Sequence, residues 1–389
     1  MRIFNTYTPT RIMFGTGQLN NLNIQKMPGK KAMVVISNGK SGRGFLPRVE
    51  EQLRLAGAEY TVFDKVESNP LKSTVEAGAA FARENGCDFV IALGGGSVID
   101  AAKVMAMLAA NPGDLWDYAF GGTGKGLIGI NPALALIVIT TTSGTGSEVD
   151  QYGVVTKPET NEKIGIGGRE DMFPVLAIVD PELTTSVPPK FTAYQGWDAL
   201  SHSMEGYISK VGNLMSDMYA LTAIENIAKY LPIVVKNGGN IEAREKMAFG
   251  NILSGLVMVV GGVTSQHSLE HAMSAYHQDL PHGAGLIMLS KAYFTHFINA
   301  HVCDERFVKM ARVMGYPNAN EPMDFIAALC KLTEDCGVAD LKMSDYKLVP
   351  DEFETLAKNA RDTMGGLFSC DRSELSIEDC VTIFRAAYR

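Results

Sequence analysis

An α/β domain with a parallel sheet, followed by an all-helical domain, is the fold class that this sequence predicts. With 389 residues, the chain is too long for one ordinary hydrophobic core. Short apolar segments alternate with segments of helical spacing in the first half, and strand signals nearly vanish beyond about residue 180. We therefore expect two domains, 1–185 and 186–389, with a hinge near Pro188 and Pro189.

The expected strands of the first domain are short and almost continuously apolar. Continuous apolar strands are covered on both faces, so they favour a parallel sheet with helices packed on each side. The expected strands are 31–37, 59–64, the segment from 88 into the glycines at 94, and 133–140. The expected intervening helices are 46–57, 71–86 and 98–111.

The pattern changes from alternating strands and helices to helices alone within 180–193, a segment that holds three prolines. Beyond it, apolar residues recur at i, i+3 and i+4, the spacing of helices with one buried face. The expected helical segments are 192–209, 217–237, 242–259, 304–314, 322–335 and 351–364.

Composition excludes several classes of partner. A net charge of −8 gives no basic footprint for nucleic acid. The first 15 residues lack the apolar core of a signal peptide, and the longest apolar run, 252–263, is too short and glycine-rich to span a bilayer. The six cysteines form no CxxC pair and read as reduced thiols. We expect a cytoplasmic protein without nucleic-acid or membrane partners.

Two polar loops follow consecutive buried strands. The first holds Gly94, Gly95, Gly96 and Ser97 before a helix, where backbone N–H groups and the positive helix end can bind phosphate. The second is TTTSGTGSEVD, 140–150. Although one such loop alone could be a tight turn, two at the carboxyl edge of a parallel sheet indicate a Rossmann-like nucleotide site.

Histidines gather in the second half. Four of the seven lie in one block, as His267, His271, His277 and His282. Upstream, Asp198 and His202 are four residues apart and share a helix face. One carboxylate with two or three imidazoles is a divalent-metal set that suits Fe(II), Zn(II), Mn(II) or Co(II) alike.

Several of these residues also have purely structural or surface interpretations. A lone Asp-x3-His pair is more often a surface or capping feature, and His277 reads as a surface or supporting residue. Glu148 and Asp150 read as solvated or structural charges, not as a catalytic pair. Lys163 either reaches a cofactor or caps a strand, and the sequence leaves both open.

The chain resembles the iron-containing alcohol dehydrogenase family over essentially its whole length. The shared motifs are ESNP (67–70), GGGSVIDAAK (94–103), TTSGTGSEV (141–149), GWDALSHSMEGY (196–207), the HSLEH and LPHG block, and GGLFSCDR near the end. The resemblance implies a dehydroquinate synthase-like architecture. It also implies that Asp198, His202, His267 and His282 bind Fe(2+), or Zn(2+) or another divalent metal, and that His271 is a proton relay.

The same resemblance implies that NAD or NADP is the cofactor and that a small alcohol or aldehyde is the substrate, in a homodimer or larger homo-oligomer. The implied cofactor-binding residues are Asn38, Asn69, Gly95, Gly96, Ser97, Asp100, Thr141, Thr142, Thr145 and Lys163.

Two departures from the family pattern matter. Relatives that favour NAD usually carry Asp after the first strand, where it binds the ribose hydroxyls, whereas this chain has Asn38 followed by Lys40 and Arg43. A neutral residue near two cations predicts that NADP is tolerated or preferred. The block from His271 to His282 is also one residue longer than in several relatives.

The expected activity is reversible hydride transfer between NAD(P)(H) and a small alcohol or aldehyde, with the metal as Lewis acid on the substrate oxygen. Glycerol dehydrogenase and dehydroquinate synthase share this architecture and are the alternatives. A non-catalytic nucleotide- and metal-binding protein is a third interpretation, although such a protein has no need of the full ligand set.

Overall fold

The computed structural model describes residues 3–39 and 42–389, and the chain forms two compact units. The α/β unit comprises 7–160 and 164–185, and the helical unit comprises 186–389 together with the described part of 1–6 and the short segment 161–163. The boundaries 1–185 and 186–389 stay predictions as limits of independently folding domains.

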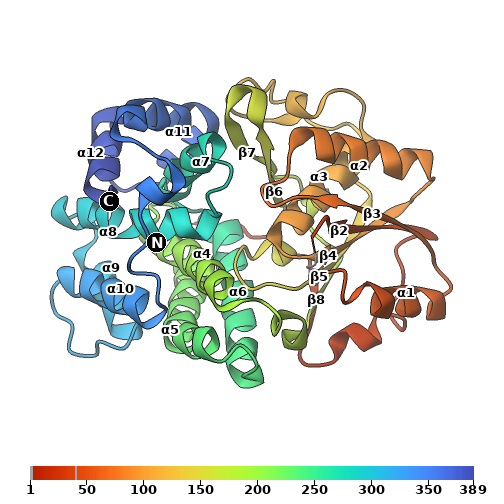
Figure 1. The fold of residues 1–389 in the computed structure, drawn as a ribbon, viewed down its shortest axis with the longest axis horizontal. Coiled ribbons are helices and arrows are strands. Elements are labelled where there is room, and N and C mark those ends of the chain that lie inside the picture. The colour runs from red at the N-terminus through yellow and green to blue at the C-terminus, as the bar shows by residue number, and fades with distance from the viewer. Residues whose placement is uncertain (1–2, 40–41) are drawn as a thin grey trace. The chain divides into compact units, whose positions relative to one another are not determined.

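Every strand of the main sheet runs parallel to its neighbours, as the continuous apolar strands predict (Figure 1). The sheet has six strands in the order β1-β8-β5-β4-β2-β3. Their bounds are β1 (Arg11–Phe14), β2 (Lys31–Ser37), β3 (Glu59–Val66), β4 (Phe89–Gly94), β5 (Ala135–Thr140) and β8 (Leu176–Val179).

Three helices connect the strands of this sheet: α1 (Leu46–Leu55), α2 (Lys72–Glu84) and α3 (Gly96–Ala110). Helix α3 packs on β4 and β5 and is buried over most of its length. Its alanines and small residues allow this close approach to the sheet. The core of the unit is aliphatic, with Val34, Ile91, Ile139 and Ile178 all inaccessible to solvent.

A two-stranded hairpin of β6 (Tyr152–Lys157) and β7 (Glu162–Gly167) lies outside the main sheet. Sequence patterns did not predict it, nor the four-residue strands β1 and β8, because so short a run shows no clear period. The contacts of the hairpin tip, 161–163, assign it to the helical unit.

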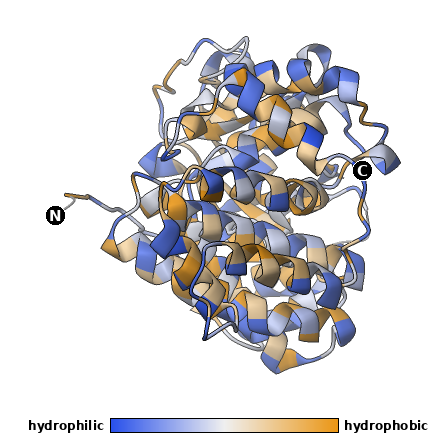
Figure 2. Cartoon of the chain, turned by 90° about the vertical axis from the view of Figure 1, so that its left-hand side faces the viewer, coloured by the Kyte–Doolittle hydropathy of each residue, from blue (hydrophilic) through white to orange (hydrophobic). Residues whose placement is uncertain are grey.

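The second unit is all-helical, as expected. Its helices are α4 (Pro189–Ile208), α5 (Leu214–Lys236), α6 (Ile241–Gly261), α7 (Gln266–Tyr276), α8 (His282–Asn299), α9 (Asp304–Val313), α10 (Met323–Asp335), α11 (Phe353–Phe368) and α12 (Ile377–Ala387). Figure 2 shows hydrophobic and hydrophilic residues alternating along the helical ribbons, as for helices with one buried face.

Helices α4, α7 and α8 differ because they are buried on nearly all sides. Polar side chains on these helices therefore lie in the protein interior, where each needs a partner. Among the described residues, no single helix is long and apolar enough to cross a membrane. The pair α6 and α7, bent by 108°, reaches that composition only when taken together.

Candidate metal centre and nucleotide loops

Three buried helices bring the four predicted metal ligands together. Asp198 and His202 lie one turn apart on α4, His267 is the second residue of α7, and His282 is the first residue of α8, directly after Pro281. Asp198 Oδ1 is 3.5 Å from His267 Nε2, 3.4 Å from His282 Nε2 and 3.8 Å from His202 Nδ1.

Imidazole packing adds to this convergence. The rings of His202 and His267 are stacked, with centroids 4.3 Å apart and planes 11° from parallel. The ligand atoms of Asp198, His267 and His282 all lie within 4.8 Å of one another. An overlapping group, formed by Glu270, His271 and His282, meets the same limit.

The chemistry of the cluster fits a divalent cation. Asp198 Oδ1 and His267 Nε2 are both buried, and neither makes a hydrogen bond within the described residues. Buried polar atoms are costly without a partner, and a cation accepts lone pairs from both atoms at once. Burial raises the pKa of Asp198, but the neighbouring imidazoles of His202 and His282 outweigh it and hold that pKa well below its usual range.

Two buried glutamates orient the imidazoles from behind. His267 Nδ1 bonds Glu205 Oε1 at 2.5 Å, and His282 Nδ1 bonds Glu270 Oε2. Both glutamates are fully buried. A carboxylate on Nδ1 holds the proton there and leaves Nε2 as the metal-binding nitrogen. The sequence interpretation missed both residues, although each follows a predicted ligand by three positions, in HSME and HSLE.

His271 lies one helical turn after His267, and its ring centroid is 5.3 Å from that of His282. Burial is the main cause that lowers the pKa of His271 well below its usual value, and the nearby positive charge of Lys163 acts in the same direction. His277, by contrast, bonds Glu352 Oε2 through Nε2 at 3.1 Å. That contact agrees with a supporting or surface role.

Lys163 is buried and belongs to the helical unit. Its Nζ donates to Ser274 Oγ at 2.9 Å and lies 3.7 Å from Glu270 Oε2. The ammonium group is therefore directed at the glutamate that holds His282.

The two polar loops of the α/β unit emerge from neighbouring strands. Gly94 pairs with Thr140, and the Thr141 N–H donates to the Gly94 carbonyl at 2.9 Å. A Cβ at Gly95 would lie 2.8 Å from Thr142 Cγ2, and one at Gly96 would lie 2.2 Å from Thr145 Cγ2. Glycine is thus required by the packing of one loop on the other, besides any approach of a phosphate.

A buried network fixes the second loop to α3. Lys103 Nζ donates to Asp150 Oδ1 at 2.6 Å, to Ser147 Oγ at 2.8 Å and to the Tyr152 carbonyl at 2.9 Å. Asp150 is buried, so the structural interpretation of this charge holds and the solvated one is wrong. Glu148 is buried as well.

Asp100, predicted to contact the cofactor, takes part in the same network. Its Oδ1 accepts from Ser147 Oγ at 2.6 Å and its Oδ2 from the Val154 N–H at 3.0 Å. Burial raises the pKa of this carboxyl group to about 6, against the lowering effect of Lys103. Both carboxylate oxygens therefore already accept hydrogen bonds from the chain itself.

The remaining predicted cofactor residues lie at strand ends. Asn38 is exposed directly after β2, and Asn69 is a non-glycine residue with a positive φ of 56°. Of the two cations expected near Asn38, Arg43 pairs with Asp64 Oδ2 at 2.7 Å. Lys40 lies outside the described residues.

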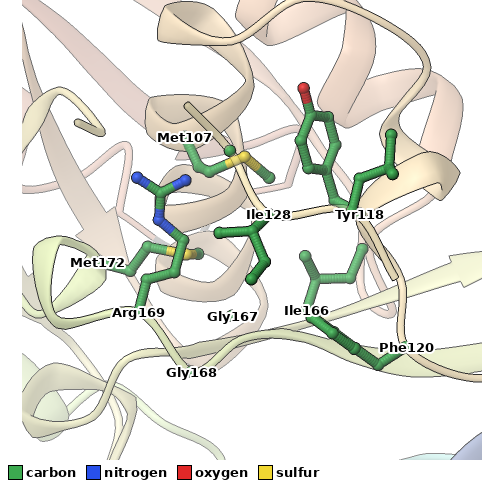
Figure 3. A pocket seen from close by; sticks show the side chains of 11 residues that line it. Met107, Tyr118, Phe120, Ile128, Ile166, Gly167, Gly168, Arg169 and Met172 are labelled. Carbon is green, nitrogen blue, oxygen red and sulfur yellow. The ribbon is translucent and has the colours of Figure 1, made fainter. Parts of the chain in front are cut away.

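A separate cavity of about 140 Å³ lies in the α/β unit and includes none of the predicted site residues (Figure 3). Its lining is mostly apolar, with Met107, Ile128 and Met172 on its walls. The one charged group, Arg169, already donates to Asp171 at 2.8 Å through Nε.

The parallel-sheet unit, the all-helical unit and the buried histidine–carboxylate cluster agree with the dehydrogenase family that the sequence resembles. Residues 9–181 match the family described as iron-containing alcohol dehydrogenase, and residues 192–388 match the C-terminal part of the Fe-containing alcohol dehydrogenase family. The chain belongs to the iron-containing alcohol dehydrogenase family, and it is an oxidoreductase.

Full-length relatives agree with this assignment. The chain is 32% identical to a 1,3-propanediol dehydrogenase of Klebsiella pneumoniae, over 100% of this chain and 99% of the relative. It is 31% identical to the NADH-dependent butanol dehydrogenase A of Clostridium acetobutylicum, over 100% of both.

Solved structures give the same picture. An archaeal halo-thermophilic alcohol dehydrogenase from a Red Sea brine pool has a TM-score of 0.92 and 33% identity, with 100% of both chains covered. A 1,3-propanediol oxidoreductase has a TM-score of 0.87 and 31% identity, again over 100% of both chains. The predicted family and fold class are thereby confirmed.

Proposed function

We propose that Asp198, His202, His267 and His282 hold Fe(II), with Zn(II) or another divalent metal as the alternative, for hydride transfer between a small alcohol or aldehyde and NAD(P)(H). The observation that carries this proposal is the pair of buried ligand atoms, Asp198 Oδ1 and His267 Nε2, without hydrogen bonds. When bound, a divalent metal polarises a carbonyl or lowers the pKa of an alcohol oxygen.

The chain's own residues have separate tasks in this proposal. Glu205 and Glu270 keep protons on the Nδ1 atoms of His267 and His282, so both Nε2 atoms point at one position. His271, buried beside His282, is the proposed proton relay between substrate oxygen and solvent. Asp198, His202 and His267 are buried, which strengthens the electrostatic contacts among them.

The glycine loop is the proposed pyrophosphate site. Gly95, Gly96 and Ser97 open helix α3, whose first N–H groups and positive dipole end suit an anion. Asn69, Asp100, Thr141, Thr142, Thr145 and Lys163 complete the set proposed from the family resemblance. The nicotinamide accepts or supplies the hydride.

Asn38 supports tolerance of, or preference for, NADP. It presents no negative charge where an Asp would repel a 2′-phosphate. The pairing of Arg43 with Asp64 reduces the local positive charge, so the preference over NAD should be modest. Relatives named for propanediol, butanol and methanol support small alcohols as substrates. A cytoplasmic homodimer or larger oligomer completes the proposal.

The test is turnover by metal-stripped protein before and after anaerobic addition of Fe(II), with a panel of small aldehydes and either NADH or NADPH. Activity that returns only with metal supports the proposal, and the faster cofactor tests the interpretation of Asn38. Metal-bound protein that reduces no aldehyde would shift the assignment towards a glycerol dehydrogenase-like or dehydroquinate synthase-like reaction.

A further inference from the structure

We propose that Lys163 is a positioning residue of the metal centre: it holds Glu270 in place and thereby aligns His282. This inference rests on the proposed function, in which His282 binds the metal. It assigns to Lys163 a task in addition to the dinucleotide contact that the family resemblance implies.

The geometry places Lys163 one contact away from the ligand pair. Its Nζ is 3.7 Å from Glu270 Oε2, the same oxygen that bonds His282 Nδ1. The side chains of Lys163 and Glu270 are 4% and 0% exposed, so water does not screen their attraction.

Ser274 fixes the ammonium group from a second direction. Its Oγ accepts from Lys163 Nζ at 2.9 Å and also lies 3.2 Å from the Glu270 carbonyl, to which it donates. Because Ser274 follows Glu270 by one helical turn, both anchors lie on the same face of α7. The lysine is therefore held against the helix that carries Glu270.

The backbone on which Lys163 stands is anchored as well. Asn161, at the hairpin tip, has a positive φ of 51°, and its carbonyl accepts a hydrogen bond from Asn359 Nδ2 at 2.9 Å. Asn359 lies on α11, a different helix from Glu270. The hairpin tip is therefore anchored to two helices of its own unit, α7 and α11, and the backbone position of Lys163 is fixed.

Charge balance explains why a cation is needed at this place. A buried carboxylate whose cationic partner is removed is left as an uncompensated charge, and the side chain then moves or water enters. Either change would release His282 Nδ1 and turn its Nε2 away from Asp198. The lysine thus acts on metal binding through Glu270 and His282, without touching the metal.

The experiment compares Lys163→Met, Glu270→Gln and the double variant, with Lys157→Met as the matched control. Lys157 lies on the same hairpin, and its Nζ bonds Thr123 Oγ1 at 2.8 Å. For each protein, Co(II) affinity and the visible Co(II) spectrum report the metal centre, and NADPH fluorescence titration reports cofactor binding.

We expect Lys163→Met to weaken Co(II) binding about 10- to 100-fold, the usual effect of disturbing groups behind a metal ligand. The Co(II) spectrum should shift, and both effects should appear in the absence of NADPH. Lys157→Met should change neither. In the double variant, the loss of Co(II) affinity should be no larger than that of either single variant, because the remaining pair is neutral.

Unchanged Co(II) affinity and spectrum together with weakened NADPH binding would overturn the proposal in favour of a cofactor contact. Additive losses in the double variant would overturn it too. If Lys163→Met folds poorly, the double variant is compared with Glu270→Gln alone, and a further loss of Co(II) affinity in the double variant would overturn the proposal, because Lys163 would then act by a route other than Glu270. Failure of the metal centre itself is recognised separately, because His267→Ala would then bind Co(II) as well as the unaltered protein.

Discussion

Each unit of the molecule buries one lysine among the described residues, Lys103 in the α/β unit and Lys163 in the helical unit, and the two differ in their surroundings. The nearest carboxylate oxygen lies 2.6 Å from Lys103, on Asp150, and 3.7 Å from Lys163, on Glu270. Asp150 otherwise bonds backbone, through the Tyr152 N–H at 2.7 Å. Glu270 instead bonds an imidazole of the metal cluster.

The comparison indicates that a buried lysine–carboxylate pair can serve the stability of a loop in one unit and the alignment of a metal ligand in the other. Around Lys103, the polar contacts join a helix to a loop, which is what stability of the loop requires. Around Lys163, the contacts lead through Glu270 to His282, one of the proposed metal ligands. Removing the first lysine should therefore cost folding, and removing groups around the second should cost metal.

The largest effect is expected for His267→Ala. The variant should lose bound metal and about 10⁴-fold or more in kcat/KM, since a metal supplies several kcal/mol of transition-state stabilisation. The unfolding free energy should fall as well, because the buried Glu205 carboxylate loses its partner and bound metal no longer stabilises the folded chain. Metal analysis, steady-state kinetics and denaturant titration check this, with His301→Asn, an exposed histidine outside the cluster, as control. Full activity in metal-free protein would contradict it.

Lys103→Met should lower the unfolding free energy by about 3–5 kcal/mol, because it leaves the Asp150 carboxylate buried without its cation. Urea denaturation followed by circular dichroism measures this. Metal content per folded chain should stay at the level of the unaltered protein. A stable variant, or one that loses metal while folded, would break the contrast between the two lysines.

Asp371 is a buried carboxylate that, unlike Asp150 and Glu270, has no ion pair with a lysine among the described residues. Its Oδ1 accepts from the Ser265 N–H at 3.1 Å, its Oδ2 makes no hydrogen bond among the described residues, and burial raises its pKa to about 7. Because the folded pKa exceeds the unfolded one, its stabilising contribution is complete below about pH 4 and is lost as pH rises through 7.

Unfolding free energies should accordingly fall between pH 4 and 7 by up to about 4 kcal/mol, since each pKa unit corresponds to 1.36 kcal/mol. Asp371→Asn should reduce this slope by the contribution of Asp371, because an amide carries no titrating proton. Asp100, whose pKa burial raises to about 6, accounts for a slope that remains. Urea titrations of both proteins across this range provide the measurement. An equal slope in the variant would assign the pH dependence to other groups.

Glu205→Gln should weaken metal binding about 10- to 100-fold, the range found for groups that orient a metal-bound imidazole. The glutamine can still accept from His267 Nδ1, so the loss should be smaller than for His267→Ala. Competition with a chelator measures the affinity. A variant with unaltered affinity would mean that Glu205 does not orient His267 for metal binding.

Asn38→Asp should give the smallest effect, a shift of about fivefold in kcat/KM from NADPH towards NADH. A new charge at an exposed position acts through water, where a like-charge contact is worth about 1 kcal/mol. Asn38→Ser is the neutral control. An Asp variant with the selectivity of the unaltered protein would place the 2′-phosphate elsewhere.

Sequence patterns predicted the parallel sheet, the helical second half and the convergence of Asp198, His267 and His282, because spacing and residue type carry that information. Glu205 and Glu270 escaped because a glutamate on a helix is normally solvated, and only the packing of other helices around α4 and α7 buries it. The pairing of Lys103 with Asp150 was not predicted, because it joins positions 47 residues apart.

The position of the hairpin tip affects where two related chains can be joined to make a chimaera. Residues 161–163 contact the helical unit although they precede Ser186 in the chain. A chimaera joined at 185/186 would therefore combine a lysine from one parent with a glutamate from the other. Where two parents differ at the positions of Lys163 and Glu270, the chimaeras that keep their metal affinity should be those that take the hairpin and the histidine block from the same parent.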